Sequence, residues 1–264
     1  MYLDKTIAVV IPALNEELSI GTVVNDLMAL RDDTGAGALI DDIVVCDNGS
    51  TDSTATIARS AGARVVQESK PGYGAACLAG IAALNPIDIV VFVDADNSAV
   101  VEELPYMVSK IPQGADLVIG SRSAGNQIKG ALTTQQRFGN WLASLLIRKL
   151  WNHPITDLGP FRTISFDALR ELQMQDQAFG WTVEMQVKAI QRQMNVVEVP
   201  VTTNKRIGRS KISGTLLGTI GAAVGIFGMI FRLYREEKQN RPAAYLSSKS
   251  AEKTGFNLKE ENTL

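Results

Sequence analysis

Two aspartates separated by a single alanine, Asp94 and Asp96, are the residues whose types and spacing indicate chemistry most directly. They follow a mostly apolar run at residues 87–93. Two carboxylates held this close repel each other unless a cation or a proton lies between them. Oxygen ligands of this kind suit Mg²⁺ or Mn²⁺, which usually also hold the phosphates of a substrate. An isolated Asp-x-Asp is more often a solvated turn, so a metal site here needs support from the rest of the chain.

Other acidic and polar residues stand where two earlier apolar runs end. Asn15 and Glu16 follow the run at residues 7–12, and Asp47 follows the run at residues 43–46. Short runs of β-branched residues indicate strands buried on both faces, and ligands of open α/β sheets bind at the carboxyl ends of the strands. We therefore expect these side chains to meet the Asp-x-Asp pair at one sheet edge, as a nucleoside diphosphate site requires. The glycine-rich motifs of dinucleotide-binding folds and of P-loops are missing from the sequence.

The elements that must position these residues alternate regularly along the first half of the chain. We predict strands at residues 7–12, 43–46, 64–67, 87–93 and 116–120, and helices at residues 18–30, 50–61, 70–84 and 102–110. This alternation indicates an α/β fold with a doubly wound, mostly parallel sheet and helices on both faces. Ser50 or Thr51 is the expected N-cap of the second helix.

The regular alternation ends after residue 122. Helices are predicted at residues 135–150 and 181–194, a short strand after the polar loop at 156–162, and a further strand at 196–201. Residues 1–214 would then form one domain. Residues 215–235 are expected to form an apolar helix. Its apolar stretch at residues 216–231 has 16 residues, fewer than the about 20 that a spanning helix needs. Residues 236–264 are polar with little periodicity, which predicts a disordered tail.

Basic residues flank the apolar helix on both sides, which fits a helix lying in a membrane interface that faces anionic lipid. Packing on the core of the protein or in a homo-oligomer interface is the alternative. The formal net charge of −2 gives no reason to expect a nucleic-acid partner. Cys46 and Cys77 lack metal-binding spacing and no signal peptide pattern is present, so we expect a cytoplasmic protein. The single histidine argues against a zinc site of the His/Cys type.

Five short motifs, in this order, resemble those of glycosyltransferase family 2. They are Pro12-Ala13-Leu14-Asn15-Glu16-Glu17, Asp47-Asn48-Gly49-Ser50-Thr51-Asp52, Lys70-Pro71-Gly72-Tyr73-Gly74, Asp94-Ala95-Asp96 and Gly120-Ser121-Arg122. Within the family, the sequence is most similar to the dolichyl- or polyprenyl-phosphate sugar synthases, over roughly residues 5–214. The resemblance implies a GT-A fold, a UDP- or GDP-hexose donor, a Mg²⁺ or Mn²⁺ ion and inversion at the anomeric carbon.

The resemblance also assigns roles to single residues. The residues that would bind the nucleotide sugar are Pro12, Ala13, Asn15, Glu16, Asp47, Lys70, Asp94 and Asp96. Asp47 would hold the base, and Asp94 and Asp96 would also bind the metal. Relatives often supply a further amide ligand two residues after the second aspartate, where this chain has Ser98.

On the acceptor side, several basic residues resemble those that surround the donor diphosphate and the acceptor phosphate in the family. They are Arg122, Arg137, Arg206, Arg209 and Lys211. The planar fork of arginine suits phosphate because it binds in a bidentate way. A solvated basic loop is the alternative for the residues after 204.

Three residues are candidates for direct catalytic roles: Arg122, Asp157 and Glu184. A sugar hydroxyl must lose a proton as it attacks, so either acid could serve as its base. A phosphate oxygen is already an anion at neutral pH and needs only positioning. With a lipid phosphate acceptor, Asp157 would therefore orient other groups.

The sequence thus predicts an inverting, metal-dependent hexosyltransferase that acts on a polyprenyl phosphate at the cytoplasmic face of the membrane. A family 2 enzyme with a soluble hydroxyl acceptor is the alternative, and it would need Asp157 or Glu184 as a base. A sugar-phosphate nucleotidylyltransferase would need a glycine-rich basic loop after the first strand, which is missing. A non-catalytic nucleotide-sugar binder would be expected to lose a metal ligand, and both aspartates are present.

Overall fold

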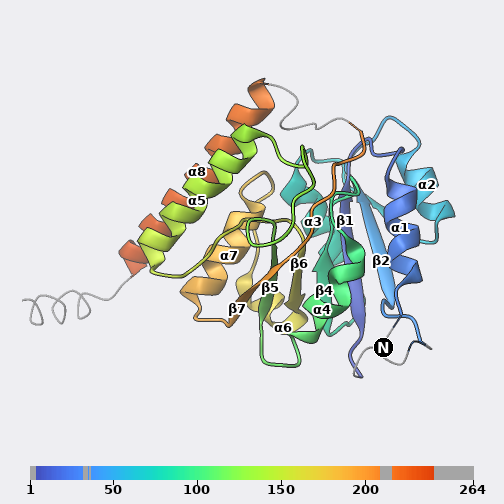
Figure 1. Cartoon of the computed structure of the whole chain (residues 1–264), viewed down its shortest axis with the longest axis horizontal. Coiled ribbons are helices and arrows are strands. Elements are labelled where there is room, and N and C mark those ends of the chain that lie inside the picture. Colours follow the sequence, from blue (N-terminus) through green and yellow to red (C-terminus); the bar gives the residue numbers. More distant parts are fainter. Residues whose placement is uncertain (1–3, 32–34, 36, 209–215, 241–264) are drawn as a thin grey trace, which may run out of the picture.

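The computed structural model of the protein describes residues 4–31, 35, 37–208 and 216–240. These residues form a seven-stranded sheet in the order β3-β2-β1-β4-β6-β5-β7, with helices on both faces (Figure 1). The strands are β1 (Ile7–Ala13), β2 (Asp42–Asp47), β3 (Arg64–Gln67), β4 (Ile89–Phe92), β5 (Leu117–Ser121), β6 (Arg162–Ser165) and β7 (Val196–Pro200). Within this sheet, β6 is antiparallel to β4 and β5, and the other neighbours are parallel. The predicted α/β architecture with a mostly parallel sheet is confirmed.

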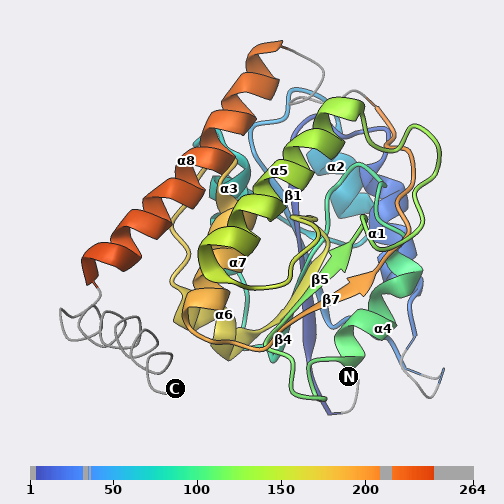
Figure 2. The same cartoon turned by 60° about the vertical axis from the view of Figure 1, so that its left-hand side comes forward.

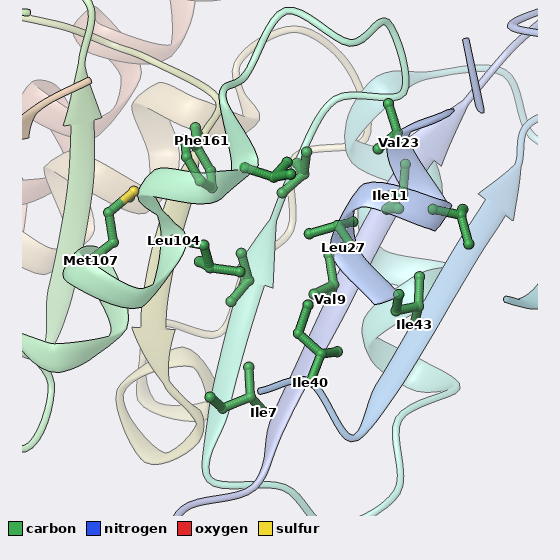
Figure 3. Packing of buried hydrophobic residues seen from close by; sticks show 14 of the residues in the cluster. Ile7, Val9, Ile11, Val23, Leu27, Ile40, Ile43, Leu104, Met107 and Phe161 are labelled. Atoms are coloured by element: carbon green, nitrogen blue, oxygen red, sulfur yellow. The ribbon is translucent and has the colours of Figure 1, made fainter. Parts of the chain in front are cut away.

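Two sets of helices cover the two faces of the sheet. One face carries α1 (Ile20–Ala29), α2 (Thr54–Ser60) and α4 (Leu104–Ser109), the last preceded by the 3₁₀ turn η1 (Val101–Glu103). The other face carries α3 (Tyr73–Ala82), α6 (Phe166–Leu172) and α7 (Trp181–Gln191). Figure 3 shows the first core, where Val9 and Ile11 of β1 lie close to Leu27 of α1, and Leu104 of α4 is also part of the cluster. Burial of apolar residues on both faces explains why the strands read as continuous apolar runs.

A third layer consists of α5 (Thr134–Trp151) and α8 (Leu216–Asn240), which lie side by side (Figures 1 and 2). Ala143 and Ile147 of α5 pack with Met229 and Ile230 of α8 against residues of α7. The C-terminal half of α8 is therefore part of the packed structure. In the described part of the chain, no helix combines the length and the apolar character that a membrane crossing requires.

The structure differs from the sequence-based expectations at a few element ends. α2 starts at Thr54, with Ser53 at the N-cap position, so the prediction that Ser50 or Thr51 caps this helix was wrong. Ser50 Oγ instead accepts a hydrogen bond from the Asn15 N–H at 2.9 Å, because the loop that follows β2 is tied to the loop that follows β1. α8 continues to Asn240, past the boundary expected near residue 235. The short helix α6, which Ser165 caps through the Ala168 N–H, was not predicted.

The register of the sheet brings the carboxyl ends of three strands together. Ala13 at the end of β1 pairs with Asp47 at the end of β2, and Val10 of β1 pairs with Phe92 at the end of β4. The loops that leave these strands carry the acidic and polar residues singled out in the sequence. The fold therefore places the acidic and polar residues that follow β1, β2 and β4 at a single edge of the sheet.

Candidate functional site

The loop that follows β4 carries the two aspartates of the Asp-x-Asp pair. Asp94 Oδ1 accepts a hydrogen bond from the Tyr73 hydroxyl at 3.0 Å. Asp96 Oδ1 accepts one from the Ser98 N–H at 3.0 Å, and Asp96 Oδ2 lies 3.4 Å from Arg206 Nη1. Burial raises the pKa of Asp94 to about 7, and the negative charge of Asp96 is the second cause of this increase. Negative charge on this pair is thus costly, and a nearby cation would lower the cost.

The residues present fit a divalent cation that is shared with a substrate. Among the described residues, no group of three or more histidine, cysteine, aspartate or glutamate side chains could hold a metal ion. A pair of carboxylates leaves room in the coordination sphere for phosphate oxygens and water, which is how Mg²⁺ is usually bound. Ser98, at the position where relatives often have an amide ligand, orients Asp96 through its backbone N–H.

Arg206 connects Asp96 with Glu16, which lies in the loop that follows β1. Its Nη2 lies 3.0 Å from Glu16 Oε1, and its Nη1 lies 3.4 Å from Asp96 Oδ2. Its buried Nε has no hydrogen-bond partner among the described residues. Arg206 therefore has an N–H donor that no described residue uses, and it lies beside the Asp94 and Asp96 carboxylates. A guanidinium in such a place is suited to bind a phosphate. The other two basic residues predicted in this loop, Arg209 and Lys211, lie outside the described residues.

Arg122 and Asp157 form a buried, bidentate ion pair. Arg122 Nε and Nη2 donate to the two oxygens of Asp157 at 2.9 and 2.7 Å, and the Arg122 N–H also donates to Oδ2 at 2.6 Å. The Asp157 side chain is completely buried. With both of its oxygens engaged, Asp157 is not placed to accept a proton from an acceptor, and it fixes the orientation of Arg122 instead.

Glu184 lies inside the protein and is also fully engaged. Its carboxylate accepts hydrogen bonds from the Gln175 and Asp176 N–H groups and forms an ion pair with Lys188 at 2.8 Å. It is completely buried and is not among the described residues that line the cavity beside the aspartates. The structure therefore does not place the two predicted bases, Asp157 and Glu184, where an acceptor hydroxyl could reach them.

The residues predicted to bind the nucleoside lie at the ends of β1 and β2. Pro12 and Ala13 are buried in β1 opposite Cys46 and Asp47. Asp47 accepts hydrogen bonds from the Ser50 N–H at 3.1 Å and from Gln67 Nε2 at 2.9 Å. The sequence-based reasoning missed Gln67, because its place at the end of a short strand gave no sign of a contact with Asp47.

Asn15 and Lys70 lie in the loops that follow β1 and β3. Asn15 adopts a left-handed backbone conformation with φ of 53°, and its Oδ1 accepts a hydrogen bond from the Thr51 N–H at 2.7 Å. Lys70 is exposed, and its carbonyl accepts a hydrogen bond from Asn48 Nδ2 at 2.7 Å. Asn15 thus links the loop that follows β1 to the loop that follows β2. Lys70 is exposed at the surface.

A cavity of about 630 Å³ begins at the aspartates and extends between the sheet and the outer helices. Its polar part is formed by Asp94, Asp96, Arg122 and Arg206. Its apolar part includes Leu132, Leu158, Phe161, Phe179, Ile226 and Phe227. Arg137 of α5, predicted to bind phosphate, is exposed and is not among the described lining residues. This apolar lining was not predicted, because its residues come from separate loops and from α8 and meet only in the folded protein.

A fully buried arginine, Arg162, was also missed by the sequence-based prediction. Arg162 donates hydrogen bonds to Gly159 O and Thr182 O, each at 2.7 Å, and to Gln186 Oε1 at 3.2 Å. Burial lowers the pKa of Arg162 to about 10. A charged residue at the start of a buried strand was the only available signal. Its contacts tie the loop that carries Asp157 to α7.

Comparisons with known proteins agree with this geometry. Residues 8–173 match the family Glycosyl transferase family 2. An uncharacterized glycosyltransferase of Mycobacterium bovis is 38% identical over 226 residues, which are 85% of this chain and 97% of that protein. A dolichyl-phosphate hexose transferase of Haloferax volcanii is 32% identical over 230 residues, covering 85% of this chain and 92% of that protein.

Solved structures of one enzyme also resemble this fold. The glucosyl-3-phosphoglycerate synthase of Mycobacterium tuberculosis, crystallised with Mn²⁺, UDP and phosphoglyceric acid, superposes with a TM-score of 0.67 at 25% identity, over 88% of this chain and 79% of that one. A structure of the same enzyme with Mg²⁺ and UDP gives a TM-score of 0.64 at 26% identity, over 87% and 79% of the two chains.

Proposed function

Because the chain belongs to glycosyl transferase family 2 and has a GT-A fold, we propose that this hexosyltransferase moves a hexose from a nucleoside diphosphate sugar to a polyprenyl phosphate. The observation that carries the proposal is the shape of the cavity, where two aspartates and two arginines continue into an apolar part between the sheet and α8. A lipid phosphate has the same two parts, a charged head and an apolar chain. The similarity to a dolichyl-phosphate hexose transferase supports this assignment.

The state of the buried acids supports a phosphate nucleophile over a hydroxyl. Asp157 and Glu184 are both held by other donors, so the site offers neither as a base. A phosphate oxygen can attack the anomeric carbon without losing a proton, and it needs only to be oriented. Arg122 and Arg206, which line the cavity, would hold the acceptor phosphate and the donor diphosphate. The new bond joins a phosphate oxygen to the anomeric carbon, and the bond to the nucleoside diphosphate breaks with inversion.

On the donor side, Asp94 and Asp96 would hold Mg²⁺ or Mn²⁺ together with the diphosphate. The cation supplies positive charge that stabilises the departing nucleoside diphosphate. Asp47 would accept hydrogen bonds from the base, beside Pro12 and Ala13 of the neighbouring strand β1. Gln67 would keep the Asp47 carboxylate in place through its 2.9 Å hydrogen bond.

Peripheral contact with the cytoplasmic face of a membrane belongs to the same proposal, because a polyprenyl chain resides in lipid. Exposed apolar side chains project from both outer helices: Phe138 and Trp141 of α5 are 60% and 52% exposed, and Val224 and Phe231 of α8 are 67% and 48% exposed. We call these four residues the membrane face. Exposed basic residues of the same helices would contact anionic headgroups: Arg148, Lys149, Arg232 and Arg235.

A soluble acceptor is the second candidate, and one observation favours it. The solved structures that resemble this fold include an enzyme crystallised with phosphoglyceric acid, at TM-score 0.67. Such an acceptor would need only the polar part of the cavity. The apolar part, to which α8 contributes Ile226 and Phe227, would then have no ligand to contact.

A donor-turnover assay separates the two candidates. UDP-glucose and GDP-mannose are each supplied with Mn²⁺ and either a short-chain polyprenyl phosphate, 3-phosphoglycerate or no acceptor. We expect turnover that requires the lipid phosphate and that is lost in Asp96→Asn. Turnover that requires phosphoglycerate, or that ignores the lipid, would contradict the proposal.

A matched pair of α8 variants tests the lipid path directly. Ala223 lines the cavity, so Ala223→Glu places a charge against the prenyl chain and should raise the KM for polyprenyl phosphate at least tenfold. Gln239→Glu adds the same charge at an exposed position of the same helix and should leave the KM unchanged. Equal KM values in the two variants would place the acceptor elsewhere.

A further inference from the structure

Tyr73 connects the start of α3 to one of the two site aspartates. Its hydroxyl donates a hydrogen bond to Asp94 Oδ1 at 3.0 Å. A phenol hydroxyl keeps its proton at neutral pH, so it is a donor to an ionised carboxylate. Because the ring is rigid, the position of this hydroxyl depends on where the first turn of α3 lies. The contact therefore makes the orientation of the Asp94 carboxylate depend on the position of a helix.

The first turn of α3 is held by the loop at residues 175–178. The Gly74 N–H donates to Ala178 O at 3.2 Å, and the Ala75 N–H donates to the preceding carbonyl of the loop at 3.0 Å. N–H groups in the first turn of a helix have no partner within the helix, so the loop supplies their acceptors. The approach is so close that a Cβ on Gly74 would lie 2.1 Å from Asp176 O. Only glycine fits there without a shift of the backbone.

Glu184 holds the same loop from the other side. Its buried carboxylate accepts hydrogen bonds from the Gln175 N–H at 3.0 Å and the Asp176 N–H at 2.7 Å, and Lys188 pairs with it at 2.8 Å. A buried carboxylate is costly unless its partners compensate the lost hydration. Here the Glu184 carboxylate holds the backbone of the loop at residues 175–178, and the same loop contacts the first turn of α3. A continuous series of contacts thus runs from Glu184 to the carboxylate of Asp94.

We propose that Tyr73 is a positioning residue for the metal ligand Asp94, and that the loop fixed by Glu184 is its support. The inference rests on the proposed function in one respect, the role of Asp94 in holding the divalent cation. Groups that hydrogen-bond to metal ligands orient them, and their loss typically lowers metal affinity by about 10- to 100-fold. Glu184 acts through the backbone of its loop and does not touch the substrate.

Direct measurement of Mn²⁺ binding in the presence of UDP, by the electron paramagnetic resonance signal of free Mn²⁺, tests this inference. Tyr73→Phe removes only the hydroxyl and should raise the Kd for Mn²⁺ by about tenfold or more. Saturating Mn²⁺ should restore turnover in this variant. Tyr106→Phe is the matched control, because Tyr106 is 54% exposed on α4, and it should bind Mn²⁺ like the wild type. A wild-type Kd in Tyr73→Phe would overturn the inference.

Two glycine variants of α3 test the support. Gly74→Ala forces the first turn away from the loop, so it should weaken Mn²⁺ binding as Tyr73→Phe does. Gly80→Ala strains the other end of α3, where the Cβ would lie 2.5 Å from Val10 Cγ1, and it should lower stability without changing the Kd for Mn²⁺. Equal Kd values in the two glycine variants would show that the first turn of α3 does not position Asp94.

Asp96→Asn serves as the reference for the proposed metal site. If it binds Mn²⁺ like the wild type, the metal role of the aspartates is wrong, and the positioning role of Tyr73 is overturned with it. If it loses Mn²⁺ while Tyr73→Phe does not, only the positioning role is overturned.

Discussion

At the scale of single residues, the contact between Arg122 and Asp157 decides what Asp157 can do. Three hydrogen bonds of 2.6–2.9 Å engage both carboxylate oxygens. Arg122 also lines the cavity, only 21% exposed at its side chain, so a shift of its guanidinium would change the polar end of the cavity. We therefore expect Asp157 to influence the reaction through the position of Arg122 and not as a base.

Asp157→Asn tests this interpretation. We expect the free energy of unfolding to fall by about 1.5–3 kcal/mol, because hydrogen bonds to a charged group are lost. The maximal rate should also fall, without a change in the shape of its pH profile. Chemical denaturation and rates across pH measure the two effects. Loss of the acidic limb of the pH profile would show instead that Asp157 is a base.

The control for stability is the exposed pair between Arg64 and Asp42. It has similar geometry, with Nη2 and Oδ2 2.6 Å apart, but the Arg64 side chain is 46% exposed. Exposed ion pairs contribute about 0–1 kcal/mol, so Asp42→Asn should cost less than Asp157→Asn. Equal losses in the two variants would mean that burial of the Arg122 pair adds nothing.

At the scale of elements, the sequence predicts the strands better than the contacts between them. The strands β1, β2 and β4 are short apolar runs because both faces of the sheet are covered, and this pattern is visible without a structure. The helix α6 was missed, because it follows β6 without an intervening loop: Ser165 ends the strand and caps the helix. The role of Glu184 was also misread, since its partners lie in a loop that has no sequence signal.

The outer helices α5 and α8 carry the prediction about membrane contact. Phe138 and Trp141 of the membrane face have ring centroids 5.9 Å apart and are both exposed. The double variant Phe138→Ser/Trp141→Ser should bind vesicles of phosphatidylcholine and phosphatidylglycerol much more weakly. A loss of about 1.4 kcal/mol of apolar burial per ring lowers the partition coefficient about tenfold for each. Co-sedimentation with vesicles at low and high salt measures the change.

Tyr106→Ser is the matched control for this experiment, because Tyr106 is a similarly exposed aromatic residue on α4. It should bind vesicles like the wild type. If the double variant also binds normally, the membrane face is not used. If it instead converts a dimer to a monomer in solution, the exposed rings form an interface between two copies of the chain.

At the scale of the whole molecule, the site is assembled from segments that are distant in sequence. Arg206 reaches Glu16 across 190 residues, and α8 completes a cavity that begins at β4. Sequence motifs singled out Asp94, Asp96 and Arg122 as candidates, and all three line the cavity, because each follows a strand of the sheet. They could not show that Arg137 points away from the cavity, since only the packing of α5 decides which of its faces is covered.

This assembly predicts that the nucleotide and the cation stabilise the protein together. Neither two carboxylates nor a diphosphate alone completes the coordination of Mn²⁺, so UDP and Mn²⁺ should raise the Tm much more together than singly. A ligand at about 100 times its Kd adds about 2.7 kcal/mol to the free energy of unfolding. For a chain of this size, that is a shift of about 5–10 °C, and a chelator should remove it.

The shift should also depend on pH, because the pKa of Asp94 is raised to about 7 by burial and by Asp96. Below this value Asp94 holds a proton in the metal-free protein, and Mn²⁺ must displace it. Between pH 8 and pH 6 the affinity should fall about tenfold, or about 1.4 kcal/mol, which is roughly half of the stabilisation. Thermal unfolding with Mn²⁺ and UDP at the two pH values measures this. An equal shift of the Tm at both pH values would mean that Asp94 is already ionised at pH 6. A shift of the Tm with Mn²⁺ alone, without UDP, would mean that the protein itself contains a complete metal site.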